Sequence, residues 1–327
     1  MRETKLSRQL KEKFDYDVSG LPAWTDNTMP NVITDLIENS EFLGMLTLEE
    51  NVKGTKEIAL LNADVTLQAK VSCTPSPDGS VIFTKANLTT VPLYAGIEFC
   101  NEDLNGKMTQ ILNALGMKKQ EGQLPAALED ILMAFLLKLL QRKAQRLVVL
   151  GDTASLDAEL ALMEGLRERI NNDTTVVDYM STAASITSSN AYDIAYGLYT
   201  SISTELLDAG TPIAMFMGRD KALLVLQDWN AANPYSQVAV PAGGTSIRFT
   251  LPLTNIEIIT LPELGSTNEM WVLPLSLVFL GVDSVDDMSF DIKYDAYDEK
   301  LKAEASFRLG VQIVWGEYFT RLQLAVS

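Results

Sequence analysis

Hydrophobic residues recur at strand-like intervals between residues 53 and 100, on both sides of a turn sequence at residues 73–79, Cys-Thr-Pro-Ser-Pro-Asp-Gly. Proline, aspartate and glycine between two such runs predict an extended antiparallel hairpin. A two-stranded ribbon of this length leaves one face and both edges uncovered in water. We therefore expect a neighbouring subunit to cover it.

The longest helical pattern covers residues 124–146, where apolar side chains recur every three or four positions. At 1.5 Å per residue the predicted helix is about 35 Å long. The apolar run at residues 147–150, Leu-Val-Val-Leu, predicts a buried strand closed by Gly151 and Asp152. A further helix is predicted over residues 154–170.

The second half of the chain alternates between helix and strand patterns. We predict a helix over residues 190–209, a strand over 212–217 and a helix that begins at Gly218 and reaches Trp229. Short strands separated by prolines are expected over residues 250–280. Strict alternation over residues 301–315 predicts a long antiparallel strand with one wet face, and its apolar face comprises Leu301, Ala303, Ala305, Phe307, Leu309, Val311, Ile313 and Trp315.

The beginning of the chain is polar, and residues 2–16 are predicted to form a helix or an arm. Residues 31–37 have helix-like spacing, and Gly44 is a predicted stop. The first 13 residues carry mixed charges and lack the apolar run of a secretory signal, and no uncharged apolar stretch is long enough to span a membrane. We expect a protein made in the cytosol.

The composition of the chain argues against several classes of protein function. The chain has 327 residues and no histidine, so the usual general base and every Ser-His or Cys-His nucleophile are missing. Lys and Arg number 26 against 43 Asp and Glu, so the net charge is 26 − 43 = −17. Such a surface repels polyanions on average, which argues against binding nucleic acid through phosphate contacts. Two cysteines, Cys73 and Cys100, are expected to be free thiols, because the predicted hairpin separates them.

Four features suggest chemistry, and each has a plainer structural interpretation. Residues 147–152 resemble the opening of a nucleotide site but lack further glycines, and the loop 242–245 has no lysine at phosphate-binding spacing. Carboxylates at 49–50, 283–287 and 291–299 could hold Ca²⁺, although solvated acidic faces explain them. The basic helix end, with Lys138, Arg142, Lys143 and Arg146, could contact DNA or a neighbouring subunit, and a solvated or ion-paired face is the plainer interpretation.

The order of these elements resembles the major capsid protein of tailed bacteriophages, the Hong Kong 97-like fold. Residues 129–165 resemble the family's helix, strand and Gly-Asp turn. Residues 215–221, Met-Phe-Met-Gly-Arg-Asp-Lys, look like its apical strand-to-helix junction, and residues 307–312, Phe-Arg-Leu-Gly-Val-Gln, look like its closing strand. The implied fold is α+β. Its parts are an N-terminal arm (1–52), an extended β-hairpin (53–100), a peripheral domain (101–175 and 285–327) with the spine helix, and an α/β axial domain (176–284).

The resemblance implies a shell protein, not an enzyme, that forms the hexamers and pentamers of an icosahedral phage head around double-stranded DNA. It implies no cofactor or metal, and it implies portal, scaffolding and cement proteins as further partners. The protein would be made in the host bacterial cytoplasm and found in the virion, with no membrane contact. Two alternatives stay open: an encapsulin shell and a cytosolic enzyme that uses carboxylates and a metal. Candidate intersubunit residues lie around the ribbon tip: Cys73, Pro75, Pro77, Asp78, Gly79, Val81 and Phe83.

Overall fold

The computed structural model describes residues 40, 42–64, 80–100, 126–208, 210–235, 238, 246–283, 289–295 and 300–325. The chain forms two compact units. One comprises Met1–Gly44, Pro92–Gln145 and Asp283–Leu309, and the other comprises Met45–Val91, Arg146–Val282 and Gly310–Ser327. The predictions for residues 2–16, 31–37 and 73–79 lie outside the described residues, and the four-part domain division remains a prediction.

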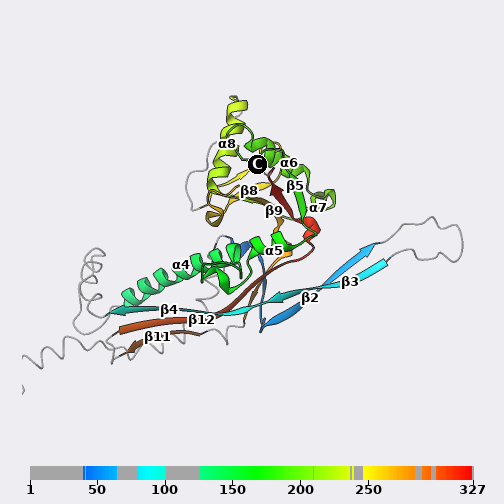
Figure 1. The fold of residues 1–327 in the computed structure, drawn as a ribbon. Coiled ribbons are helices and arrows are strands. Elements are labelled where there is room, and N and C mark those ends of the chain that lie inside the picture. The colour runs from blue at the N-terminus through cyan, green and yellow to red at the C-terminus, as the bar shows by residue number, and fades with distance from the viewer. Residues whose placement is uncertain are drawn as a thin grey trace, which may run out of the picture. The chain divides into compact units, whose positions relative to one another are not determined.

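The ribbon is present, but it is shorter than predicted (Figure 1). Strands β2 (Thr55–Asp64) and β3 (Ser80–Thr89) pair antiparallel from Thr55 opposite Thr89 to Asp64 opposite Ser80. The returning arm was expected to reach Cys100, and that part of the prediction is wrong. Because β2 begins only at Thr55, the chain after Thr89 has no partner in the ribbon, and β4 (Val91–Cys100) pairs with β12 instead.

The long strand near the end of the chain is confirmed as β12 (Lys300–Ile313). It pairs antiparallel with β11 (Ser289–Asp295), with Ser289 opposite Ser306 and Asp295 opposite Lys300. The sheet order is β1-β10-β12-β11, with β4 also on β12, and β1 (Thr47–Glu49) runs parallel to β10 (Val278–Val282). The predicted apolar face is buried at Ala305, Leu309, Val311 and Ile313. Trp315 lies beyond the strand, because its φ of 55° is left-handed.

The predicted spine helix is confirmed as α4 (Ala126–Leu150), which extends four residues beyond Arg146. The strand predicted at residues 147–150 is therefore wrong. Leu147, Val148 and Val149 are buried in the last turn of the helix, and the amide of Gly151 still donates to the Leu147 carbonyl at 2.8 Å. A short run of apolar residues has no polar position to distinguish a period of 3.6 from a period of 2, so the pattern was ambiguous.

The helix predicted over residues 154–170 is largely a loop. Only η2 (Leu160–Leu162) and α5 (Leu166–Asn172) are helical there. Aspartate and serine side chains bond the local backbone, as in the 2.8 Å bond from the Ala154 amide to Asp152 Oδ1, and such bonds compete with helix formation. Other short 3₁₀ turns are η1 (Leu43–Met45), η3 (Pro262–Leu264), η4 (Leu275–Leu277) and η6 (Gly316–Tyr318).

A six-stranded mixed sheet forms the centre of the α/β module, in the order β5-β13-β9-β6-β8-β7. Its strands are β5 (Val177–Met180), β6 (Ile213–Met217), β7 (Arg248–Thr250), β8 (Glu257–Thr260), β9 (Met270–Pro274) and β13 (Thr320–Gln323). β6 confirms the strand predicted at residues 212–217. The short strands predicted over 250–280 are also present. β13 was not predicted, and it pairs parallel with β5 and antiparallel with β9.

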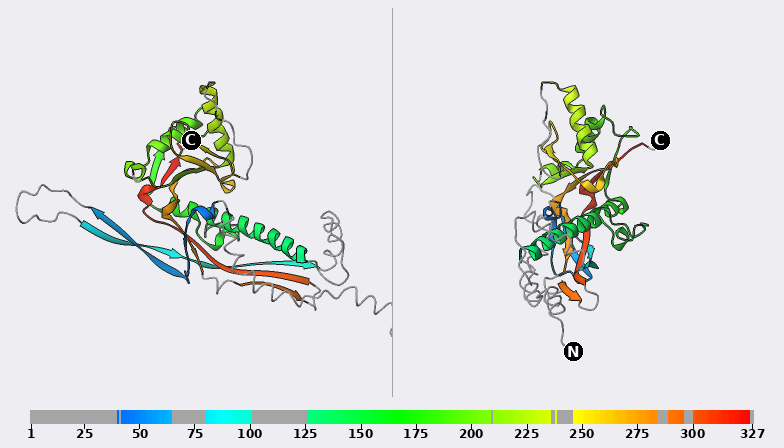
Figure 2. Two further views of the ribbon diagram at one scale, coloured as in Figure 1. Left: turned by 180° about the vertical axis from the view of Figure 1, so that it is seen from behind. Right: turned by 90° about the vertical axis from the view of Figure 1, so that its left-hand side faces the viewer.

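Helices α6 (Ala191–Thr200), α7 (Thr204–Asp208) and α8 (Arg219–Ala232) belong to the same module (Figure 2). The helix beginning at Gly218 is confirmed. The single helix predicted over 190–209 is broken, because Ser201 Oγ donates to the Leu198 carbonyl at 2.7 Å and a new helix begins at Thr204. Buried residues of α6 and α8 share one core with Met215, Met217, Ile258, Met270 and Val272 of the sheet. No helix in the described part of the chain is long and apolar enough to cross a membrane.

Candidate intersubunit surface

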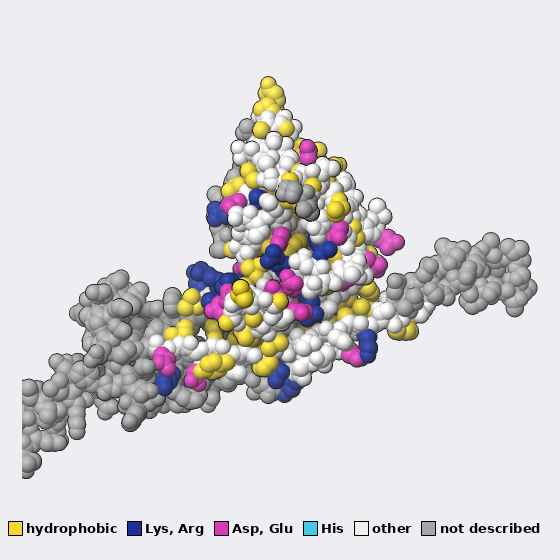
Figure 3. Space-filling model, in the orientation of Figure 1, with side chains coloured by type: hydrophobic (Ala, Val, Ile, Leu, Met, Phe, Trp, Pro, Cys, Tyr) yellow, Lys and Arg dark blue, Asp and Glu magenta, His cyan; other side chains and the backbone are white. Residues whose placement is uncertain are grey.

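The outer half of the ribbon has an exposed apolar face. Leu61 of β2 lies directly opposite Phe83 of β3, and Val81 is two residues from Phe83, so the pleat places all three on one face. Their exposed fractions are 54% for Leu61, 77% for Phe83 and 57% for Val81. Figure 3 shows hydrophobic side chains on the surface of the described part of the ribbon. Side chains of this size normally stabilise a protein by leaving water.

The opposite face of the ribbon is better covered. Ile58, Leu60 and Ala86 are half-buried there, and Leu88 is completely buried near the base. The two faces therefore differ: one already has partners along part of its length, and the other presents Leu61, Val81 and Phe83 to solvent. We call the exposed set of Leu61, Val81 and Phe83 the apolar ribbon face.

Charges occupy the inner half of the ribbon. Lys85 pairs with Glu57 across the two strands at 2.5 Å, and Lys56 pairs with Glu49 at 2.5 Å. Both pairs are substantially exposed, so each contributes under about 1 kcal/mol to stability. Lys85 and Glu57 lie on the same face as Leu61 and Phe83, toward the base, so charges border the inner side of the apolar ribbon face, as in a contact surface with a polar rim.

Buried hydrogen bonds fix the base of the ribbon. Thr90 is buried, and its Oγ1 donates to the Val52 carbonyl at 2.7 Å and accepts from the Gly54 amide at 3.3 Å. The Thr90 amide donates to the Gly54 carbonyl at 2.7 Å. Gly54 has a φ of 102°, a conformation that other residues adopt only with strain. The point where both strands leave the sheet is thus defined by bonds and by backbone conformation.

Two glycines let other strands approach the ribbon's base closely. A Cβ at Gly310 of β12 would collide with the backbone oxygen of Thr89. A Cβ at Gly281 of β10 would lie 2.9 Å from Thr90 Cγ2 and 3.0 Å from Leu88 Cδ2. Backbone from β10 and β12 therefore packs directly on the last residues of β3. The base of the ribbon is therefore tightly packed, whereas its outer half has few partners in the described chain.

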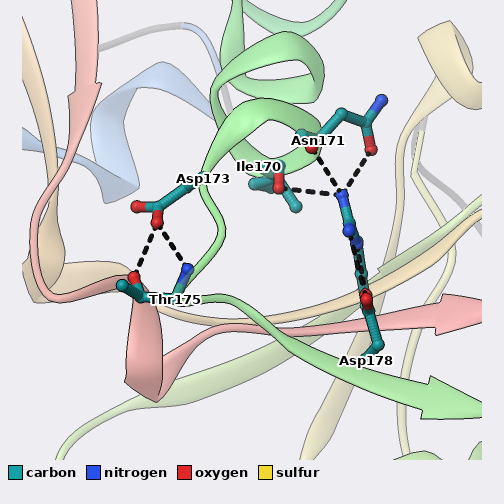
Figure 4. A network of polar contacts seen from close by, with 6 residues as sticks. Ile170, Asn171, Asp173, Thr175 and Asp178 are labelled. Carbon is teal, nitrogen blue, oxygen red and sulfur yellow. Dashed lines mark hydrogen bonds and ion pairs between the residues drawn. The ribbon is translucent and has the colours of Figure 1, made fainter.

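A separate polar network holds the end of the chain in the α/β module (Figure 4). The Arg321 guanidinium of β13 forms an ion pair with Asp178 of β5. It also donates to the carbonyls of Ile170 at 3.1 Å and Asn171 at 2.9 Å, at the end of α5. The hydrogen bond from Arg321 lowers the pKa of the Asp178 carboxyl below its usual value. One side chain thereby ties α5, β5 and β13 together.

The intersubunit role of all seven predicted site residues remains a prediction. Cys73, Pro75, Pro77, Asp78 and Gly79 lie outside the described residues, so their role remains a prediction. Val81 and Phe83 are exposed on the ribbon. Leu61 was missed, because a turn of uncertain length leaves the register open and only the register places Leu61 beside Phe83.

The other residues considered for ligand binding or catalysis mostly have structural roles. A Cβ at Gly151 would lie 2.6 Å from the Leu147 carbonyl oxygen, so this turn is filled by its own backbone. Among the acidic clusters, Glu49 pairs with Lys56, and Asp283 is buried and pairs with Arg308 at 3.3 Å. Among the described residues, no three Cys, Asp or Glu side chains come together in an arrangement that could hold a metal ion.

No family model matches the chain, and no curated protein matches it. Solved structures do. A chain of the satellite phage P4 procapsid, solved with its size determination protein, is 9% identical with a TM-score of 0.59, over 91% of this chain and 98% of that chain. A capsid chain of an empty GTA particle is 10% identical with a TM-score of 0.57, over 88% and 90% of the two chains.

A virus-like particle from Pyrococcus furiosus is also similar, at 10% identity and a TM-score of 0.51, over 91% of this chain and 98% of that chain. At such low identity the likeness establishes the fold, and it extends over nearly the whole length of these subunits. The chain has the α+β fold of the Hong Kong 97-like phage capsid proteins.

Proposed function

We propose that this protein is a major capsid protein, which assembles into the hexamers and pentamers of an icosahedral phage head. The observation that carries the proposal is the ribbon: a rigidly based pair of strands whose outer face presents Leu61, Val81 and Phe83 to water. A monomeric protein gains nothing from exposing these side chains on an extended ribbon. A subunit that lays the ribbon over its neighbour buries them.

The energetics favour collective assembly. Burying a large aliphatic or aromatic side chain contributes about 1.5 to 3 kcal/mol. Association also costs orientational freedom, and a ribbon already fixed at Thr90 and Gly54 loses less of it than a mobile segment would. Each contact is then weak enough to be corrected during assembly, while a closed shell repeats it many times. Shell stability would rise with subunit concentration.

The charge balance suits a container for DNA. With a net charge of −17 the wall repels a polyanion on average, so packaged DNA would be enclosed without sequence-specific binding and could move. We propose no catalytic role and no cofactor, and the lack of histidine supports this. Portal, scaffolding and cement proteins of the same phage are the expected partners, and the virion is the expected location.

An encapsulin shell is the alternative, because it would have the same fold, but the similarity to phage capsid chains favours the phage head. The two candidates differ in what the shell contains. Purified shells that hold nuclease-protected double-stranded DNA support the phage head. Shells that hold a single cargo protein and no DNA support the encapsulin.

The role of the ribbon can be tested by deleting residues 71–81, which removes the tip and Val81. The expected product is a soluble, folded subunit that forms no closed shells. A second variant replaces the same residues with a Gly/Ser segment of equal length, which separates the effect of length from that of the side chains. This variant should also fail to assemble, because it keeps the length but lacks the predicted contact residues. Normal shells from the deletion would overturn the ribbon's assignment as an intersubunit strap.

A further inference from the structure

A second surface of the chain is built for contact, and it lies on the loop at residues 152–164. Two glycines close this loop at its base. The Gly165 amide donates to the Gly151 carbonyl at 2.8 Å, and a Cβ at Gly165 would lie 2.6 Å from the Gly151 nitrogen. The Asp152 amide also donates across the loop to the Leu160 carbonyl at 2.9 Å. The loop is therefore closed by its own backbone.

The apex of this loop is apolar and fully exposed. The Leu156 side chain has no cover, with an exposed fraction of 105%, and Leu162 on the same loop is 50% exposed. One exposed leucine on a protein surface needs no explanation. Here, however, the residues on both sides of Leu156 are held: the Ser155 amide donates to the Asp152 carbonyl at 2.9 Å, and Asp157 pairs with Arg146 at 2.9 Å.

Fixing the backbone around an exposed leucine lowers the entropy that a partner must remove on binding. A loop that only connects α4 to α5 would gain nothing from this arrangement. The charges on the loop indicate what the partner carries. Residues 152–164 contain four carboxylates and no lysine or arginine: Asp152, Asp157, Glu159 and Glu164. Arg146 pairs with Asp157 and Glu159, and Arg169 pairs with Glu164, so two arginines offset part of this charge and the loop remains acidic on balance. An apolar apex with an acidic rim requires an apolar spot with a basic rim.

Helix α4 presents such a spot. Residues 138–146 contain Lys138, Arg142, Lys143 and Arg146 and no acidic residue. Lys138, Arg142 and Lys143 are exposed, and the half-buried Leu139 lies one turn before Arg142 and Lys143 on the same side of the helix. We call Lys138, Leu139, Arg142 and Lys143 the basic face of α4.

Two cations of this face are available for a partner. Within the described part of the chain, Lys138 and Arg142 have no ion pair or hydrogen bond, whereas seven other cations pair with a carboxylate of their own chain: Lys56, Lys85, Arg146, Arg167, Arg169, Arg308 and Arg321. Arg219 and Lys221 of α8 are likewise unpaired among the described residues, so they provide a matched comparison.

We propose that the 152–164 loop of one copy docks on the basic face of α4 of a second copy, with Leu156 against Leu139 and the loop carboxylates around Lys138 and Arg142. This contact rests on the proposed shell function and is separate from the ribbon. It gives the subunit two independent surfaces for its neighbours. DNA is another negatively charged partner that the basic face could bind. The amount of DNA that the assembled shells retain distinguishes DNA from the loop as the partner of this face.

Two charge-reversed variants test the basic face. Lys138→Glu with Arg142→Glu should raise the subunit concentration needed for shell assembly by roughly tenfold or more, because the loop's carboxylates would then meet like charges. The control is Arg219→Glu with Lys221→Glu on α8, which changes the net charge equally and should assemble normally. On the loop, Leu156→Ser should impair assembly, whereas Leu253→Ser, at a leucine that is 79% exposed, should not.

Cross-linking tests the contact itself. Subunits carrying Leu156→Cys are mixed with subunits carrying Arg142→Cys, both with Cys73→Ser and Cys100→Ser. Oxidation of the assembled mixture should give a covalent dimer that neither variant gives alone. Leu253→Cys mixed with Arg142→Cys should give none.

The outcomes separate this contact from the proposed function. If the wild type forms shells while the basic-face and Leu156 variants assemble as well as it does and no dimer forms, the contact is wrong and the shell function stands. If the basic-face variant assembles normally but retains less DNA, the face binds DNA and the proposal is overturned. If the wild type forms no shells, the proposed function fails, and this contact fails with it.

Discussion

Leu61 and Phe83 face each other across β2 and β3, and more than half of each side chain is exposed. Cross-strand pairs of this kind stabilise a hairpin modestly through their mutual contact. The larger share of their apolar surface is still in water. Both residues are therefore better placed to bind a neighbour than to hold their own ribbon together.

Replacing this pair should separate assembly from folding. Leu61→Ser with Phe83→Ser is expected to abolish shells while changing the free energy of unfolding by no more than about 1 kcal/mol, because exposed positions contribute little. Sedimentation measures the assembly, and thermal unfolding measures the stability. Tyr94→Ser, at a residue of β4 that is 68% exposed, is the control and should assemble normally. Shells from the double variant would mean that the apolar ribbon face makes no essential contact.

Thr90 should matter for stability. Thr90→Val keeps the shape of the side chain but removes the donor to the Val52 carbonyl, which leaves a buried acceptor unpaired. The expected loss is about 1 to 3 kcal/mol in denaturant unfolding. Thr84→Val, at an exposed position of β3, should be neutral or slightly stabilising. Equal effects from the two variants would contradict the role given to the buried hydroxyl.

Gly310 should not tolerate a side chain. In Gly310→Ala the new methyl would collide with the backbone of Thr89, so β12 or β3 must move, at a cost of about 1 to 3 kcal/mol. Gly96→Ala is the matched strand control, because its new methyl would meet only the movable end of Tyr94. Denaturant midpoints measure both. A stable Gly310→Ala variant with a normal midpoint would show that the packing at the ribbon's base is loose.

The Arg321–Asp178 pair should make stability depend on pH. Because the hydrogen bond from Arg321 lowers the pKa of the folded Asp178 carboxyl below its ordinary value of 3.8, its contribution to stability is complete above that value and is lost as the pH falls through the folded pKa. Asp178→Asn should therefore be less stable than the wild type at pH 7, by roughly 1 kcal/mol since the carboxylate is partly exposed. The difference should shrink in acid. A difference that is constant from pH 7 to pH 2 would contradict the pairing.

Much of the architecture follows from local patterns. The alternation of apolar and polar residues over 300–313 predicts β12, although the polar side chains Lys302, Glu304, Ser306 and Arg308 are half-buried and the expected wet face is not exposed. The spacing in residues 126–146 predicts most of α4. Both signals extend over ten or more residues, so no single exception obscures them. The Gly218 junction is also predictable, since a short buried strand ends where a helix begins.

The incorrect predictions mostly concern segments whose structure depends on which strand they pair with. Residues 91–100 have the pattern of a strand, but only the beginning of β2 at Thr55 shows that they cannot belong to the ribbon. Residues 147–150 are entirely apolar, so their spacing does not distinguish a helix from a strand. Leu61 belongs to the candidate surface only because the register places it opposite Phe83. Long-range pairing is not encoded in the spacing of a single segment.

Assembly into shells is tested by electron microscopy of the purified, concentrated protein, alone and with any scaffold protein of the same phage. We expect closed particles, or rings and tubes built from hexamers, because the ribbon requires a neighbour to cover Leu61, Val81 and Phe83. A uniform monomer or dimer under both conditions would contradict it.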